Sequence, residues 1–289
     1  MEALMSVDVE EWFHIPKGLD NYLPFNEWDT AQQRVQYVLP RILDLFEKNE
    51  VRATFFILGW IAEKHPELVK ETVRRGQNIA THGYVHKLIF NQTPDEFRSD
   101  IYRSTSVLEN LTGRKVIGYR APGFSITPET EWAFEILAEQ GIKYDSSIYP
   151  GKRFYGFHEK FDKSPIIVDT RSGEIVEFPQ SLIDFGFFKL SCFGGGYFRL
   201  FPKSIFLTMA NMLNKTGRPL VFYIHPRDID TDQPQIRFPF LKKVRHYINI
   251  SKTEQKLDEI TRHFDFKSFE MMISDVSFMG KLTHSSRIK

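Results

Sequence analysis

The segment Asn78-Ile79-Ala80-Thr81-His82-Gly83-Tyr84-Val85-His86 contains a short apolar run followed by two histidines. The run at 78–81 predicts a buried strand that delivers His82 at its C-terminal end. His82 and His86 are four residues apart, so they can face the same way on a helical turn or in a tight loop. Since neutral imidazole is a common ligand of zinc and similar metals, the pair predicts a metal site. The same spacing also occurs on ordinary surface helices, so the rest of the chain has to support this interpretation.

Short apolar runs alternate with helical patterns on both sides of this segment. Further strands are predicted at 4–9, 53–58, 115–119, 142–144 and 219–224. Helices are predicted at 31–48, 66–75, 127–141 and 252–263, and after the capping-box sequence Thr93-Pro94-Asp95-Glu96. This alternation predicts an α/β fold built from βα units around a parallel sheet.

Polar residues with a common chemistry lie at the ends of these strands. At or just past the C-terminal end of a predicted strand stand Asp8 or Glu10, His82, Arg120, Asp145 and His225. In barrels of parallel strands, that rim is where active sites are built. Carboxylates, imidazoles and a guanidinium together suit metal-assisted hydrolysis, whereas a chance distribution would show no such coherence.

Bulk properties exclude some classes of protein and partner. The length of 289 residues suits one large α/β domain or two ordinary ones. A net charge of +1 gives no support for a nucleic-acid partner. The single cysteine, Cys192, rules out an intrachain disulfide and is compatible with a reducing compartment. No apolar stretch approaches the roughly 20 residues of a membrane span, and no secretory signal is recognisable, so we expect a cytoplasmic protein.

The organisation expected from these patterns is one domain over residues 1–289. An irregular stretch rich in Gly, Phe and Ser suggests an insertion at about 151–200. A C-terminal extension is expected from about residue 230, and the polar tail after Lys281 is expected to be frayed.

These motifs, taken in order, resemble those of the polysaccharide deacetylases of the NodB-homology type, carbohydrate esterase family 4. Within that family the resemblance is closest to the branch associated with bacterial exopolysaccharide biosynthesis. It covers nearly the whole chain and rests on the segments 6–13, 53–56, 81–86, 118–125, 144–150, 194–199 and 223–228. The resemblance implies a distorted (β/α)7 barrel, with about seven strands in place of the usual eight. It also implies a divalent metal held by one carboxylate and two histidines, with zinc favoured and cobalt or nickel fitting similar ligands.

The first motif departs from the family pattern. The common form has two adjacent Asp residues, a base and then a metal ligand, but here Asp8 is followed by Val9. Glu10 lies two residues further on and would share a face with Asp8 in an extended strand. The resemblance extends to related branches with an Asp-x-Asp/Glu arrangement, in which the later carboxylate is the ligand, and it therefore implies the metal role for Glu10 and the base role for Asp8. Glu11 is the rival ligand, although a solvated loop carboxylate is its simpler interpretation.

The resemblance then assigns a role to each remaining residue. Glu10, His82 and His86 would hold the metal, Asp8 would take a proton from water, and Arg120 would orient a carboxylate.

His225 would be the general acid, with a pKa near neutrality. The alternative interpretation is a histidine that is simply buried in the core with its hydrogen bonds satisfied. Asp145 or Asp228 would orient it, and the sequence leaves that choice open. A backbone N–H near Gly123 or Phe124 could stabilise an oxyanion. The candidate substrate contacts are Trp12, Gly123, Phe124 and Tyr197.

The expected function is a metal-dependent hydrolase that removes N-acetyl groups from an amino sugar in a polysaccharide or its precursor. Two alternatives remain open from the sequence. One is a C–N hydrolase of small cyclic amides or ureides on the same barrel, and the other is a non-catalytic carbohydrate-binding protein. Metal content and substrate turnover would separate the three.

Overall fold

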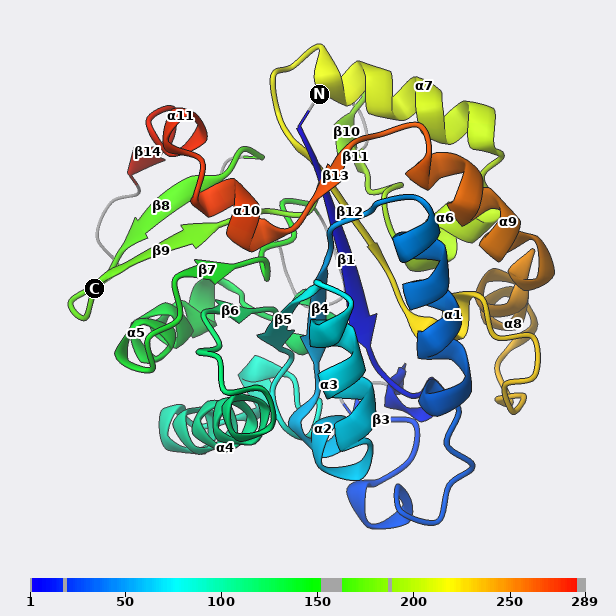
Figure 1. Ribbon diagram of the computed structural model, residues 1–289, viewed down its shortest axis with the longest axis horizontal. Coiled ribbons are helices and arrows are strands. Elements are labelled where there is room, and N and C mark those ends of the chain that lie inside the picture. The colour runs from blue at the N-terminus through cyan, green and yellow to red at the C-terminus, as the bar shows by residue number, and fades with distance from the viewer. Residues whose placement is uncertain (1, 18–19, 152–162, 187–188, 285–289) are drawn as a thin grey trace.

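Parallel strands form the centre of the molecule (Figure 1). The computed structural model describes residues 2–17, 20–151, 163–186 and 189–284. Seven strands in these ranges pair side by side and in parallel. Across the sheet they are β12 (Leu220–Ile224), β1 (Ala3–Val9), β4 (Thr54–Ile57), β5 (Asn78–Thr81), β6 (Gly118–Tyr119), β7 (Tyr144–Asp145) and β9 (Glu174–Glu177). The predicted α/β fold around a parallel sheet is thus confirmed.

Shorter strands extend this sheet and form two small ones. β8 (Ile166–Asp169) pairs antiparallel with β9, and β14 (Thr283–His284) pairs with β8. β13 (Phe266–Lys267) adds to β1. The two-stranded sheets are β2 (Pro16–Lys17) with β3 (Asp20–Asn21), and β10 (Ile183–Asp184) with β11 (Lys189–Leu190). Among the described residues, the hydrogen-bonded path runs from β12 to β14 without returning to its start.

Helices cover the outside of the strands. Figure 1 shows the first helices following the strands in order, and α1, α3, α4 and α5 pack successively on one another. The helices are α1 (Val35–Lys48), α2 (Gly59–Lys64), α3 (Pro66–Arg74), α4 (Pro94–Thr112), α5 (Trp132–Glu139), α6 (Gly195–Leu200), α7 (Lys203–Asn214), α8 (Phe240–Tyr247), α9 (Ile250–Thr261), α10 (Phe269–Ile273) and α11 (Val276–Met279). No helix in the described ranges is long and apolar enough to cross a membrane.

Two predicted helices differ from the observed ones. The helix predicted from residue 31 begins only at Val35, because the Glu11 carboxylate accepts the backbone N–H groups of Arg34 and Val35 and so fixes the helix start. The helix predicted at 127–141 is divided into a 3-10 turn (Pro128–Thr130) and α5. Each predicted strand is present; β5 has its predicted bounds, and the ends of the others are shifted or shortened by up to a few residues.

The sheet places the polar strand ends on a rigid, buried base. All seven residues of β1 are buried, including Asp8, which continues the strand between two apolar neighbours. The apolar side chains of β1, β4 and β12 belong largely to one core cluster that also includes the inner face of α1. The predicted insertion contains β8 to β11 and α6, while its residues 152–162 and 187–188 lie outside the described ranges. The predicted frayed tail likewise lies outside them from residue 285 onward.

Candidate active site

The carboxyl ends of β1, β5, β6 and β12 bring their polar residues into contact. Glu10 follows β1, and its Oε1 lies 3.0 Å from His82 Nε2 and 3.0 Å from His86 Nε2. All three side chains are buried, at 4% exposure or less. Glu10, rather than Asp8, therefore lies against the two histidines.

The Nδ1 atoms of both imidazoles, which are the outer nitrogens that face away from Glu10, are held by neutral acceptors. His82 Nδ1 lies 2.7 Å from the Arg120 carbonyl oxygen, and His86 Nδ1 lies 2.7 Å from Asn21 Oδ1. The Asn21 amide orientation is fixed because its Nδ2 donates to the carbonyls of Val85 and His86. Each Nδ1 therefore carries a proton, and in the neutral ring Nε2 then presents its lone pair toward Glu10.

This arrangement fits a divalent cation. Burial lowers the pKa of His86, against the opposing effect of Glu10, so the ring is neutral at pH 7. Two lone pairs and a carboxylate oxygen that converge in a buried space repel one another unless a cation lies between them. Two imidazoles and one carboxylate, with the outer ring nitrogens hydrogen-bonded, form a donor set that suits zinc and similar ions.

The histidines lie in a tight loop, not on a helical turn. Gly83 has φ +79° and His86 has φ +52°. A Cβ atom at Gly83 would lie 2.8 Å from Asp100 Oδ2, so only glycine fits here. Asp100 of α4 accepts the N–H of Tyr84 at 2.8 Å and that of Val85 at 3.4 Å. The conformation of this loop is therefore fixed by α4, the helix that follows it in the chain.

Arg227 contacts the second oxygen of Glu10. Its Nη1 donates to Glu10 Oε2, leaving Oε1 to face the histidines. Burial raises the pKa of Glu10, but opposing effects, of which the charge of Arg227 is the largest, hold that pKa well below its usual range. Glu10 is therefore ionised at neutral pH.

Asp8 and Arg120 form a buried ion pair beside this cluster. Arg120 Nη1 donates to Asp8 Oδ1 at 2.6 Å and to Ser6 Oγ at 2.8 Å. The opposite side of the guanidinium donates to the carbonyl and hydroxyl oxygens of Ser146. Asp8 Oδ2 lies 3.9 Å from His225 Nε2. Arg120 thus has the predicted contact with a carboxylate, whose second oxygen faces His225.

His225 is held by Asp228. The Asp228 Oδ2 atom lies 3.1 Å from His225 Nδ1 and also accepts the backbone N–H of His225 at 2.8 Å. Asp145 instead accepts the hydroxyl and N–H of Ser147 and shares a buried position with Glu177. Of the two residues predicted to orient His225, Asp228 is therefore the one in contact with it.

The expected near-neutral pKa of His225 is not observed. Burial, reinforced by the charge of Arg227, lowers the pKa of His225 well below its ordinary value. His225 is therefore neutral in the resting protein, with Nδ1 donating to Asp228 and Nε2 free to accept a proton.

Glu11 is not a solvated carboxylate, contrary to the simpler interpretation. It is 1% exposed, and its two oxygens accept the N–H groups that begin α1. Burial raises its pKa to about 7, partly offset by these backbone hydrogen bonds. Its carboxylate is thus committed to the helix terminus.

The predicted substrate contacts are largely packed into the protein. Trp12 is 9% exposed, and its indole N–H donates to the Gln32 carbonyl at 2.8 Å. The Phe124 N–H already donates to the Ala121 carbonyl, so it is not available as an oxyanion donor. Gly123 precedes it with φ +63°.

The two remaining aromatic rings also pack on protein groups. The Phe124 ring packs edge-to-face on Tyr223, and Tyr197 stacks on Phe201. The role of these rings in substrate binding remains a prediction.

Three functional neighbours had no role in the sequence prediction. Arg227 pairs with Glu10, and Arg199 forms an ion pair with Asp228. Both arginines lie within segments that carry the family resemblance, so their position was a usable signal. Asn21, which holds His86, lies outside every such segment, and only the tertiary structure reveals its contact.

Comparisons with known proteins divide the chain at the end of β7. Residues 22–144 match the polysaccharide deacetylase family, and residues 146–274 match a domain of unknown function (DUF3473). The cluster draws on both regions and on the preceding residues: Glu10 lies before the first match, the two histidines lie within it, and Arg227 lies in the second.

Among curated relatives, a peptidoglycan-N-acetylglucosamine deacetylase of Bacillus cereus is 36% identical over 97 residues, covering 33% of this chain and 35% of that protein. The matched part spans about a third of the length of the first curated relatives, at 35% and 36%.

Solved structures share the fold at low sequence identity. A "putative polysaccharide deacetylase" from Mycobacterium smegmatis has a TM-score of 0.60 at 21% identity, covering 88% of this chain and 81% of that one. Puue allantoinase has a TM-score of 0.59 at 14% identity, covering 92% and 86%. At these identities the likeness concerns the fold alone.

Proposed function

We propose that the chain, whose residues 22–144 match the polysaccharide deacetylase family, is a metal-dependent hydrolase that removes N-acetyl groups from an amino sugar in a polysaccharide or its biosynthetic precursor. The observation that carries the proposal is a single buried cluster of two imidazoles, a carboxylate and a second, ion-paired carboxylate, formed by His82, His86, Glu10 and Asp8 with Arg120. The sequence resemblance to the exopolysaccharide-associated branch supports a glycan of that class.

The metal would be held by Glu10, His82 and His86, and zinc is the ion that these ligands favour. When bound, such an ion supplies Lewis acidity, which makes water a stronger acid and polarises a carbonyl oxygen. The side chains of the protein then have three tasks, which are to orient the attacking water, to accept its proton, and to protonate the departing nitrogen.

Asp8 is the proposed base. Arg120 holds Asp8 Oδ1, so Oδ2 is the oxygen left to accept the proton of an attacking water. The same Oδ2 lies 3.9 Å from His225 Nε2, which is free to accept a proton in the resting state. Because this distance exceeds that of a direct hydrogen bond, Asp8 would pass the proton to His225 through one intervening water, and the resulting imidazolium, stabilised by Asp228, would donate it to the leaving amine.

The neutral resting state of His225 determines the order of the two proton transfers. A general acid that starts without a proton must first receive one. Two carboxylates lie near His225 Nε2, Asp8 at 3.9 Å and Glu10 at 4.0 Å, and Asp8 is the one that does not also contact His82 and His86. We therefore place His225 as a shuttle between Asp8 and the nitrogen.

The decisive experiment measures acetate release from chito-oligosaccharides by the zinc-loaded protein, with allantoin and cyclic imides as matched alternative substrates. The proposal expects acetate release and no imide turnover. Turnover of imides without acetate release would contradict the proposal and favour the cyclic-amide hydrolase. Absence of both activities in a protein that binds no divalent ion would favour the non-catalytic carbohydrate-binding protein.

A further inference from the structure

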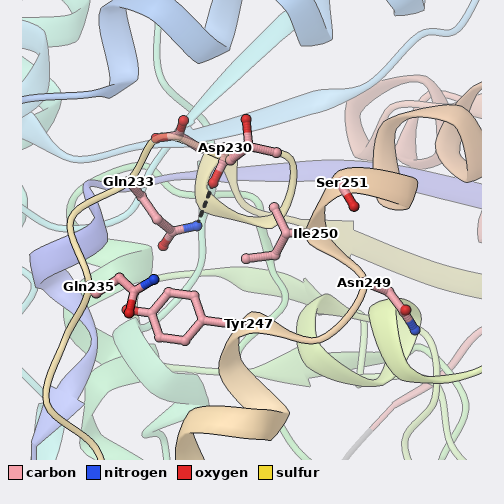
Figure 2. Close-up of a pocket in the computed structure, with 8 residues that line it drawn as sticks. Asp230, Gln233, Gln235, Tyr247, Asn249, Ile250 and Ser251 are labelled. Atoms are coloured by element: carbon pink, nitrogen blue, oxygen red, sulfur yellow. Dashed lines mark hydrogen bonds between the residues drawn. The ribbon is translucent and has the colours of Figure 1, made fainter.

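A polar pocket adjoins the loop that carries Arg227 and Asp228. It has a volume of about 270 Å³ and lies between residues 230–235 and the turn from α8 into α9 (Figure 2). Its lining consists of Asp230, Thr231, Gln233, Gln235, Tyr247, Asn249, Ile250 and Ser251. These residues lie in the domain of unknown function and include no residue of the metal cluster.

Gln233 places an unpaired acceptor in this pocket. Its Nε2 donates to the carbonyls of Arg227 at 2.7 Å and Asp230 at 2.8 Å, which fixes the amide orientation. Its Oε1 is buried and accepts no hydrogen bond from the described residues, although Gln233 is only 7% exposed. In Figure 2 the amide lies between Asp230 and Tyr247, with its bonded nitrogen toward Asp230. A buried acceptor without a partner favours a ligand that donates a hydrogen bond.

The pocket has no net charge to attract an ion. Asp230 is its one carboxylate, and Arg34 pairs with both of its oxygens, at 2.8 and 2.9 Å. The Asp232 N–H also donates to Asp230. The remaining polar groups are amides and hydroxyls, beside the ring of Tyr247. Amides and hydroxyls around an aromatic ring suit a neutral ligand that has both hydroxyl groups and an apolar face.

Both sides of the pocket are hydrogen-bonded to the arginines of the active site. Gln233 donates to the carbonyl of Arg227, whose guanidinium contacts Glu10. Asn249 donates through Nδ2 to the carbonyl of Arg199, whose guanidinium pairs with Asp228. A ligand bound here would therefore contact groups that position the catalytic charges, without entering the metal cluster.

We propose that this pocket is an accessory subsite for one neutral sugar unit of the glycan. Its volume is slightly below the range of about 300–1,000 Å³ typical of small-molecule sites, which suits a ligand as small as a single sugar. That the sugar belongs to the chain being deacetylated rests on the proposed function. The subsite itself rests on the unpaired Gln233 acceptor and on the neutral polar lining.

The test blocks the pocket from its exposed rim. Ser251 lines the pocket and is exposed, whereas the neighbouring Lys252 is exposed but does not line it. Ser251→Trp should fill the pocket without disturbing the hydrogen bonds of Gln233, and Lys252→Trp is the matched control. Binding of chitotetraose is measured by calorimetry on zinc-loaded protein carrying Asp8→Asn, so that no turnover interferes. We expect Ser251→Trp to weaken binding about tenfold or more and Lys252→Trp to leave it unchanged.

A second variant and a competitor complete the test. Gln233→Met removes the unpaired acceptor, and it should also weaken chitotetraose binding if its unfolding temperature shows that the protein remains folded. Equal affinity in all variants, or no affinity for chitotetraose, overturns the subsite. Displacement of chitotetraose by inorganic phosphate that is lost in Ser251→Trp also overturns it, because it would identify the pocket as an anion site.

Acetate release by the wild-type protein is measured separately. Release without any effect of Ser251→Trp on binding refutes the subsite alone. Weakened binding in that variant, without release from any N-acetylated sugar by the wild type, refutes the proposed function and leaves a sugar site.

Discussion

Two loops at the carboxyl ends of parallel strands both begin with a histidine, but they are built differently. The loop after β5 carries His82 and His86, whose outer nitrogens face a carbonyl and an amide oxygen. The loop after β12 carries His225, whose outer nitrogen faces the carboxylate of Asp228. A neutral acceptor fixes the ring and leaves a neutral ligand, whereas a carboxylate also stabilises the protonated ring. The first loop thus suits metal binding and the second suits proton transfer.

The contacts that hold the two loops also differ in charge. The β5 loop is held by uncharged backbone donors, with the N–H groups of Tyr84 and Val85 bonded to Asp100. The β12 loop is held by charge pairs, with Arg227 on Glu10 and Arg199 on Asp228. If this division is correct, substitutions in the two loops should separate metal content from turnover.

Replacement of the first histidine of each loop by alanine should have the largest effect. His82→Ala removes one of two imidazole ligands and should abolish both zinc binding and acetate release. His225→Ala should abolish most turnover, by about 10² to 10⁴-fold, while leaving one zinc bound. Metal analysis of the purified variants, beside acetate release, measures both effects. Loss of zinc in His225→Ala, or full zinc content in His82→Ala, would reverse the assignment of the two loops.

Replacement of Asp8 should have the same effect as replacement of His225 in the β12 loop, which is loss of turnover without loss of zinc. Asp8→Asn keeps the size of the side chain but removes the base, so turnover should fall by about 10² to 10⁴-fold with zinc retained. Glu10→Gln is the matched variant and should lose zinc, because Glu10 contacts both histidines. Loss of zinc in Asp8→Asn but not in Glu10→Gln would show that the two carboxylates have exchanged roles.

Asp228→Asn tests whether the carboxylate distinguishes the β12 loop. The amide can still accept from His225 Nδ1, but it no longer stabilises the imidazolium. We expect kcat to fall by about 10- to 100-fold with zinc content unchanged. The midpoint of the pH profile of kcat should also shift, which a merely structural effect would not produce. An unchanged profile would contradict the shuttle role of His225.

Asn21→Ala makes the corresponding change behind the β5 loop. Without its acceptor, His86 loses the hydrogen bond that orients its ring, and zinc affinity should fall by about tenfold. Competition with a zinc chelator measures this affinity directly. The neighbouring exposed residue Asp20 provides the control, since Asp20→Ala should leave the affinity unchanged. Equal zinc affinities in Asn21→Ala and the wild type would show that the ring is fixed by the loop alone.

Some features of the site could be predicted from local sequence, and others depend on contacts between distant residues. Strand-end residues such as His82 and Arg120 were predictable, because parallel strands bring their carboxyl ends to one edge and each strand is a short apolar run. The start of α1 was not, because it depends on Glu11, more than twenty positions earlier in the chain, capping the helix through space.

Charge pairs across the site were equally hidden from the sequence. Arg227 was visible in its motif, but its contact with Glu10 joins residues 217 positions apart. The low pKa of His225 likewise depends on burial and on the Arg227 charge, and neither follows from local sequence. Local patterns thus predicted which residues reach the site, but not which of them would pair there.

The smallest expected effect concerns the carboxylate that holds the β5 loop. Burial raises the pKa of Asp100 to about 6, against the opposing hydrogen bonds from Tyr84 and Val85. The folded protein therefore holds this proton more tightly than the unfolded chain, whose value is 3.8. The resulting stability is present below about pH 4 and is lost as pH rises through about 6, and it amounts to no more than about 3 kcal/mol. Asp100→Asn does not titrate, so the wild type should exceed it in unfolding free energy by more at pH 4 than at pH 7. Urea unfolding across this range measures the difference, with Asp95→Asn as the exposed control on the same helix. A difference that does not change with pH would show that Asp100 holds the loop without the penalty that burial implies.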